Sequence, residues 1–200
     1  PSAEIALTGI LELIGKVSQS CKVSLFENKL DYQGRLLMSE VYQWSNTGLA
    51  DQLGNPIFNM LPYQPNYNRW EMELKSGRHV EGEVGEFPIS ERPLLKTNGI
   101  EKLLLLPILI KGDFFFFVML AICRDRYRWV DDEIALIKST IAPIASFLEI
   151  KIEGQKRDLS DERLRRIFEH SNIGLVLATK EGILKSFNPA FSEMLGYNDV

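Results

Sequence analysis

Two histidines and two cysteines are the residues of this chain best suited to bind a metal or act as nucleophiles. Cys21 and Cys123 do not form a CxxC pair, and neither lies near His79 in the sequence. We find no Ser-His-Asp set, HExxH motif or glycine-rich phosphate loop, and His170 ends an amphipathic segment. The sequence therefore predicts reduced thiols, no structural metal and no enzyme active site within these residues.

The charge balance also limits the function. With a net charge of -4, the chain lacks the basic surface that nonspecific nucleic-acid binding needs. A content of 45% hydrophobic residues is typical of a globular protein with a real core, and 200 residues suit two small domains or one domain with an additional segment. We see no signal peptide and expect a piece of a longer, cytoplasmic protein.

An apolar stretch at residues 103–123, LLLLPILIKGDFFFFVMLAIC, raises the question of a membrane span. Lys111 and Asp113 fall in its middle, where each charge would cost about 2.5–3.5 kcal/mol at bilayer depth. Pro107 would also disturb a helix. The alternative is two strands, 103–110 and 114–123, around a tight turn at Gly112. We predict this hairpin, buried on both faces, and no membrane span.

Upstream of this hairpin, apolar spacing predicts a helix followed by two strands. The segment 46–68 is rich in Gly, Asn, Pro and Gln, and loops of this length are often lids or binding segments. Ser90 is the expected N-cap of a helix that precedes the hairpin. The expected elements are a helix at 3–17, strands at 21–27 and 35–45, a helix at 69–77, a strand at 79–84 and a helix at 89–99.

After the hairpin, a long amphipathic segment begins near Asp131. Five apolar residues repeat at spacings of 3, 4, 3 and 4 and read as a short heptad seam: Ile134, Ile137, Ile141, Ile144 and Leu148. The seam can pack on the domain's own sheet or form a dimer helix. Pro143 predicts a kink. Residues 154–161 are either a polar linker or a continued helix.

The order of these segments resembles a GAF domain, a small-molecule-sensing module of signalling proteins. The residues that carry the resemblance are LKSGRHVEGEV, ISERPLLKTNGIEKLLLLPILIKGDFFFFVMLAIC and RYRWVDDEIALIKSTIAPIASFLEI. It implies an α+β fold with an antiparallel sheet flanked by helices and a long C-terminal connector helix. Lys102 and Phe117 stand near positions where the family usually has Ser and Gly. These larger side chains would make the inner wall of the domain's pocket bulkier.

Residues 164–200 resemble the first part of a PAS domain, through FEHSNIGLVLAT, EGILKSFNPAF and MLGY. Their pattern indicates a helix, a hairpin turning at 180–182 and a helix that starts at Pro189. GAF followed by PAS is common in bacterial sensor histidine kinases and nucleotide cyclases. We therefore expect a GAF-like domain at 1–152, a helical or polar linker at 153–163 and an incomplete PAS-like α/β segment at 164–200.

Cyclic-nucleotide-binding GAF domains carry an Asn-Lys, Phe and Asp-Glu pattern, and part of it has counterparts here. Trp129 matches the aromatic, and Asp132 with Glu133 matches the acidic pair, but the Asn-Lys portion is missing. We favour a structural role, in which Arg124 or Arg126 pairs with Asp131 or Asp132. Bilin-binding GAF domains have a Cys beside a His, which this chain lacks. We therefore expect no cyclic nucleotide, no bilin and no other evident cofactor.

A pocket, if present, should lie between the sheet and the segment 46–99. Its candidate walls are Tyr42, Trp44, Trp70, His79, Phe87 and Phe115. We favour the alternative that these aromatics fill the core. The chain is expected to be a non-catalytic sensory module and a homodimer. It would pass a signal from an unknown small molecule or partner to a kinase or cyclase domain elsewhere, the alternative being a dimerisation spacer without ligand.

Overall fold

The computed structural model describes residues 3–46, 58–123 and 129–196. The chain divides into two compact units, Pro1–Phe147 and Leu148–Val200. The boundaries that we expected from the sequence stay predictions. Each unit is described by itself below.

The first unit is built on a six-stranded sheet. Its strand order is β3-β2-β1-β6-β5-β4, and the strands pair antiparallel throughout. The strands are β1 (Lys22–Leu30), β2 (Leu36–Ser45), β3 (Leu61–Pro62), β4 (Val80–Glu83), β5 (Lys102–Ile110) and β6 (Asp113–Ile122). The expected strands are confirmed, and β3 is an additional short strand in the segment that we expected to be mostly loop.

The apolar stretch 103–123 forms the predicted hairpin of β5 and β6. Lys111 and Gly112 make its turn with φ of 54° and 89°, and the side-chain-free Gly112 accepts such a conformation without strain. β6 lies between β1 and β5, so both of its edges are hydrogen-bonded, and residues 116–122 are buried on both faces of the strand. No helix in the described ranges 3–46, 58–123 and 129–196 is long and apolar enough to cross a membrane.

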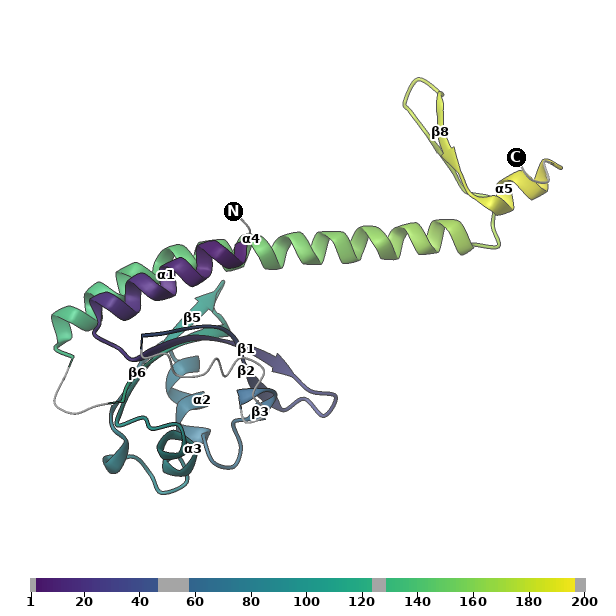
Figure 1. Cartoon of the computed structure of the whole chain (residues 1–200). Coiled ribbons are helices and arrows are strands. Elements are labelled where there is room, and N and C mark those ends of the chain that lie inside the picture. The colour runs from purple at the N-terminus through teal and green to yellow at the C-terminus, as the bar shows by residue number, and fades with distance from the viewer. Residues whose placement is uncertain (1–2, 47–57, 124–128, 197–200) are drawn as a thin grey trace. The chain divides into compact units, whose positions relative to one another are not determined.

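Helices cover the two faces of this sheet (Figure 1). One face, called the inner face, carries Phe26, Leu105 and Phe117 and packs against α2 (Asn68–Lys75) and α3 (Arg92–Thr97). The opposite, outer face packs against α1 (Ala3–Val17) and the first part of α4 (Asp131–His170). Successive side chains of a strand point to opposite faces of the sheet. Because helices cover both faces, the side chains on both sides of β5 and β6 are buried, and neither strand alternates polar with apolar residues.

The long helix α4 runs for 40 residues without interruption and continues through Pro143. Residues 154–161 are part of it, so the helical alternative for this segment is confirmed. The isoleucine and leucine stripe is buried within the single chain, at no more than 5% exposure for Ile134, Ile137, Ile141, Ile144 and Leu148. This burial leaves these side chains little surface for another chain.

The second unit contains the end of α4, the hairpin of β7 (Val176–Ala178) and β8 (Leu184–Phe187), and α5 (Pro189–Met194). Asn188 caps α5, since its side-chain oxygen accepts from the amide of Phe191 at 3.1 Å. The predicted hairpin and the predicted start at Pro189 are confirmed.

Two expectations are wrong. Cys21 and Cys123 form a disulfide with their Cα atoms 5.9 Å apart, not two reduced thiols. The cysteines are 102 residues apart, and the pairing of β1 with β6 brings them together. Ser90 is not the cap of α3, because Glu91 occupies that position and the Ser90 hydroxyl donates to Asn66.

Candidate functional site

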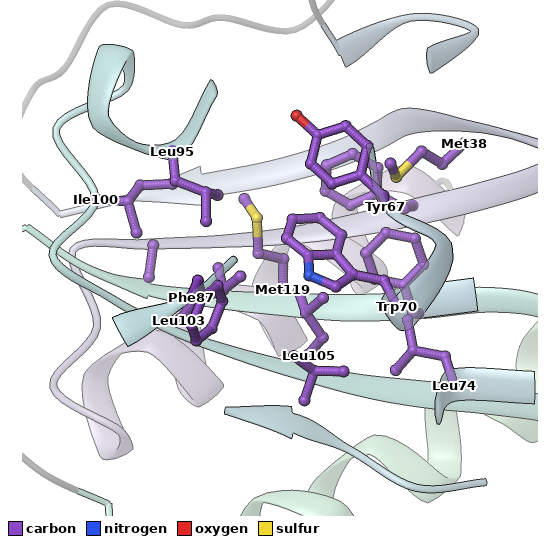
Figure 2. Packing of buried hydrophobic residues seen from close by; sticks show 14 of the residues in the cluster. Met38, Tyr67, Trp70, Leu74, Phe87, Leu95, Ile100, Leu103, Leu105 and Met119 are labelled. Atoms are coloured by element: carbon purple, nitrogen blue, oxygen red, sulfur yellow. The ribbon is translucent and has the colours of Figure 1, made fainter. Parts of the chain in front are cut away.

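The inner face of the sheet is packed with aromatic and methionine side chains (Figure 2). Trp70 and Leu74 enter from α2, Phe87 precedes α3, and Met119 and Leu105 rise from the sheet. The rings of Phe26 and Phe117 stack with centroids 4.7 Å apart. The aromatic cluster thus fills the central part of the region where the sequence placed a pocket.

A buried carboxylate holds α2 against the start of α3. Glu91 is 1% exposed and accepts hydrogen bonds from the Trp70 indole at 2.8 Å and from the Arg69 guanidinium, with Nε at 3.0 Å. The same guanidinium lies over the Phe87 ring, 4.8 Å from its centroid. These contacts satisfy a charge that would otherwise be costly in an apolar core.

Two tyrosines of the inner face have perturbed ionisation. Burial, with a smaller contribution from Glu91, raises the pKa of Tyr67 to about 12. Burial also raises the pKa of Tyr63 well above its usual value, and its hydroxyl donates to Asn28 Oδ1 at 2.8 Å. Both phenols are neutral donors near pH 7, not bases or nucleophiles.

An irregularity in the β5–β6 ladder decides which phenylalanines face inward. The register shifts so that Ile108 pairs with Phe116 and Leu109 with Phe114, which makes Phe115 the additional residue of a β-bulge. The rings of Phe114 and Phe117 consequently lie 6.2 Å apart, beside the cluster. Strict alternation would place Phe115 on the same face as Phe117, but the bulge places Phe114 there instead.

The predicted pocket residues divide between the two faces. Trp70 and Phe87 meet in the aromatic cluster. Tyr42 and Trp44 lie on the outer face of β2, where the Trp44 ring occupies the space beside Gly15 of α1. His79 is half-buried beside Lys138 of α4, with Nδ1 3.3 Å from Nζ, and Phe115 is half-buried at the bulge. The six residues therefore do not line one pocket.

The predicted structural residues lie near the start of α4. The Trp129 indole donates to the carbonyl of Ser18 at 3.2 Å, and Glu133 accepts from the amide of Val130 at 3.1 Å. Asp132 is exposed, and Arg124 falls outside the described residues, so its predicted ion pair stays a prediction. A cleft of about 280 Å³ beside Trp129 is lined by Glu81, Glu83, Glu86 and Lys102.

A second cleft of about 340 Å³ lies between β5 and α4, where Leu106 and Ile108 face Ile141 and Ala145. No group of three or more metal-binding side chains occurs in the part of the chain that the structure describes. The first cleft contains the buried Lys102, whose Nζ lies 3.4 Å from Glu83 Oε1, whereas the second is lined mainly by apolar side chains.

A row of polar residues on the inner face was missed by the sequence analysis. Lys22 and Ser24 of β1 are buried on this face and lie beside Ser45 and Glu40 of β2. A signal was available, because Lys22 and Ser24 alternate with the apolar Val23 and Leu25. On an exposed strand such alternation marks the solvent side, and only the sheet order shows that this side is covered.

Comparisons with known proteins agree with this architecture. Residues 162–200 match the model of the PAS domain family. Over 129 residues, 64% of this chain, the sequence is 30% identical to the methanogenesis regulatory histidine kinase FilI of Methanothrix harundinacea (strain 6Ac). The chain spans only 14% of the length of that curated relative.

Solved GAF domains are similar to the chain in structure. The blue-light absorbing form of the PixJ GAF domain of Thermosynechococcus elongatus superposes with a TM-score of 0.63 at 10% identity, over 79% of this chain and 90% of that one. A GAF domain/HD domain protein of Geobacter sulfurreducens gives 0.55 at 18% identity, over 74% and 91%. The chain therefore has a GAF-like α+β fold, followed by a segment that matches the PAS domain family.

Proposed function

We propose that this chain is a non-catalytic sensory or regulatory module of a signal-transduction protein. The GAF-like fold and the similarity to a regulatory histidine kinase over 129 residues support this role. A kinase or another output domain would then lie elsewhere in the parent protein. The raised pKa values of Tyr63 and Tyr67 keep these phenols protonated near pH 7, and Glu91 is engaged by Arg69 and Trp70, as expected of residues with a structural role.

The observation that carries the proposal is the continuity of α4. Its first part buries Ile134, Ile137 and Ile141 in the GAF-like unit, and the same helix continues to His170, inside the segment that matches the PAS family. A helix transmits rotation or translation along its length because its backbone hydrogen bonds keep it rigid. An effector that favours one packing of α4 on the sheet would thereby bias the next domain.

We also propose that the module acts as a homodimer. Because the heptad stripe is buried in the single chain, the dimer would use exposed apolar residues of the outer helices. These include Leu13 and Val17 of α1, at 55% and 54% exposure, and Leu136 of α4, at 56%. Large apolar side chains gathered on exposed helices often mark an interaction surface.

A spacer role without ligand is the second candidate. The packed aromatic cluster favours it, because the centre of the inner face leaves little space for a large ligand. A cytoplasmic location remains a further proposal, and the Cys21–Cys123 disulfide weighs against it, since such bonds persist mainly in oxidising compartments.

The test is a pair of insertions after Gly154, in the exposed part of α4, made in the full-length parent protein. Two inserted alanines rotate the downstream helix by about 200°, whereas seven add about two full turns and nearly restore its phase. A sensory helix predicts that the two-residue insertion strongly changes the parent's output activity and that the seven-residue insertion largely restores it. Equal output from both variants and the wild type would support a passive spacer instead.

A further inference from the structure

The cleft between β5 and α4 lies on the outer face of the sheet, opposite the aromatic cluster. Leu106 and Ile108 of β5 form one wall, Ile141 and Ala145 of α4 form the other, and all of its lining residues belong to the first unit. Its volume of about 340 Å³ equals that of about eleven molecules of liquid water. This space suits an organic molecule of about ten non-hydrogen atoms.

The sheet leaves this cleft open on the side of β4. In the register, β4 pairs only with residues 102–105 of β5. The remaining residues of the strand, 106–110, have a sheet neighbour only on the β6 side in the part of the chain that the structure describes. A small molecule can therefore reach the walls without the separation of two strands.

Small side chains of α4 create the space. Lys138, Ala142 and Ala145 follow one another at intervals of four and three residues, so they share one face of the helix, next to the buried Ile141. Ala142 is exposed and Ala145 is half-buried. Because each contributes a single methyl group, a longer apolar side chain at either position would fill the cleft.

One cation stands beside these apolar walls. Of the described residues that line the cleft, only Lys138 carries a charge. Its Nζ lies 3.3 Å from His79 Nδ1, and the imidazole nitrogen accepts because an ammonium can only donate. The nearby carboxylate of Glu81 lies 4.0 Å from the other ring nitrogen, His79 Nε2.

The contact with His79 orients the ammonium of Lys138 but supplies no negative charge. Within the described ranges, no carboxylate forms an ion pair with Lys138. Roughly two of its three N–H donors stay available for another acceptor. The cleft thus combines apolar walls with a positive charge that the described residues do not neutralise.

We propose that this cleft binds a small organic monocarboxylate with an apolar chain, of the kind represented by medium-chain fatty acids. The chain would lie between the walls of β5 and α4, where burial of its apolar surface is favourable. The carboxylate would accept a charge-assisted hydrogen bond from Lys138. Apolar walls with one polar group that fixes orientation are typical of small-molecule sites.

This site deepens the proposed sensory function and rests on it for biological meaning. A ligand in the cleft would contact β5 and α4 together, and Ile141 belongs both to the cleft and to the buried stripe of α4. Occupancy can therefore change the packing of α4 on the sheet without entering the aromatic cluster. A packed inner face and a ligand-responsive helix are compatible in this arrangement.

Binding is tested on the 200-residue chain by recording ¹H–¹⁵N NMR spectra during titration with octanoate. Octan-1-ol and octylammonium keep the apolar chain and replace the carboxylate by a neutral and a cationic group. We expect saturable shifts at amides within 106–110 and 138–145, with octanoate bound about three- to tenfold more tightly than octan-1-ol. Octylammonium should bind most weakly.

Three outcomes of this titration would overturn the proposal. They are the absence of saturable octanoate shifts in these two segments, octylammonium binding as tightly as octanoate, and equal shifts at the exposed apolar residues of the β7–β8 hairpin, such as Leu177 and Leu184. The last result would show that octanoate merely coats apolar surface.

The variant Ala145→Leu tests the place of binding by filling the cleft. Its matched control is Ala135→Leu, an exposed position of α4 outside the cleft. We expect Ala145→Leu to abolish the saturable octanoate shifts, and Ala135→Leu to bind octanoate like the wild type. Wild-type octanoate binding by a folded Ala145→Leu chain would contradict the proposed site.

The variant Lys138→Gln tests the charge and does not depend on filling the cleft. The affinity for octanoate should fall about three- to tenfold, while the affinity for octan-1-ol stays the same. Lys16→Gln is the control, because it removes a lysine of α1 that lies outside the cleft and pairs with Glu12. Equal losses of octanoate affinity in both variants would refute the role of Lys138.

This proposal and the sensory function fail separately. Octanoate binding in the cleft without any response in the parent's output would contradict the sensory function and keep the site. Phase-dependent output after the α4 insertions, without octanoate binding, would do the reverse.

Discussion

The carboxylate of Glu91 lies at 1% exposure between α2 and α3, where it accepts hydrogen bonds from Arg69 and Trp70. Glu91→Ala would leave the indole N–H unpaired and the guanidinium partly uncompensated. We expect a loss of about 2–3 kcal/mol in the free energy of unfolding, less than for a fully buried pair because the Arg69 side chain keeps 34% exposure. Urea unfolding followed by circular dichroism measures this loss.

The control for this variant is Glu12→Ala, which removes an exposed ion pair with Lys16 on α1. Exposed pairs of this kind contribute little, so the change should stay within about 0.5 kcal/mol. Equal stabilities of the two variants would mean that Glu91 does not hold α2 and α3 together.

The raised pKa of Tyr67 predicts a dependence of stability on alkaline pH. Between its ordinary value of 10 and the folded value of about 12, the folded state holds a proton that the unfolded state has lost. Stability therefore falls as pH rises through this window and is unaffected below it. Tyr67→Phe should reduce the slope of Tm against pH from 10 to 12. Tyr63, whose pKa is also raised, would account for a remaining slope. An unchanged slope in the variant would contradict the assignment to Tyr67.

At the level of elements, the packing of α1 on β2 depends on a glycine. A Cβ at Gly15 would lie 2.0 Å from Cζ3 of Trp44, so Gly15→Ala must displace the indole. We expect a destabilisation of about 1–3 kcal/mol from overpacking, measured by urea unfolding. The double variant with Trp44→Leu should recover part of this loss.

Gly9 on the same helix provides the matched control, since nothing lies within 4 Å of a Cβ built there. Gly9→Ala should stabilise the chain by about 0.5–1 kcal/mol through helix propensity alone. If both substitutions were stabilising, the close approach of α1 and Trp44 would be wrong.

The disulfide joins the segment before β1 to the segment after β6. The strands are already paired there, and the amide of Cys21 donates to Ala121 at 2.9 Å, so the bond reinforces an existing contact. Replacing both cysteines by serine should cost about 2–5 kcal/mol, because the bond closes a span of 102 residues in the unfolded chain. The fold should nevertheless persist.

Thiol titration of the unfolded, non-reduced protein checks the bond directly. We expect no reactive thiol before reduction and two afterwards. Two reactive thiols without reduction, in protein purified under oxidising conditions, would contradict the disulfide.

At the scale of the whole molecule, the proposed homodimer rests on exposed apolar side chains of α1 and α4. Leu136→Glu places a charge on the exposed side of α4, at a position of 56% exposure in the single chain. We expect at least a tenfold weaker dimer by sedimentation equilibrium. Met72→Glu on α2, at 62% exposure on the other side of the sheet, is the control and should dimerise like the wild type. A wild-type parent protein that stays monomeric at high concentration would refute the dimer.

By itself, the sequence determined the local elements. The hairpin of β5 and β6 follows from an apolar run interrupted by Lys111 and Gly112, and α1 follows from its helical spacing. Such patterns depend on neighbours within one or two turns, so no long-range contact is needed to read them. The resemblance to GAF and PAS domains rests on the order of these elements.

Only the tertiary structure decided which side chains meet. A one-residue shift at Phe115 reassigns the inward-facing phenylalanines, and the antiparallel register alone brings Cys21 to Cys123. The burial of Glu91, and of Lys22 and Ser24 in the polar row, likewise depends on what covers the sheet. These properties depend on contacts between residues far apart in the chain, and local periodicity carries no information about them.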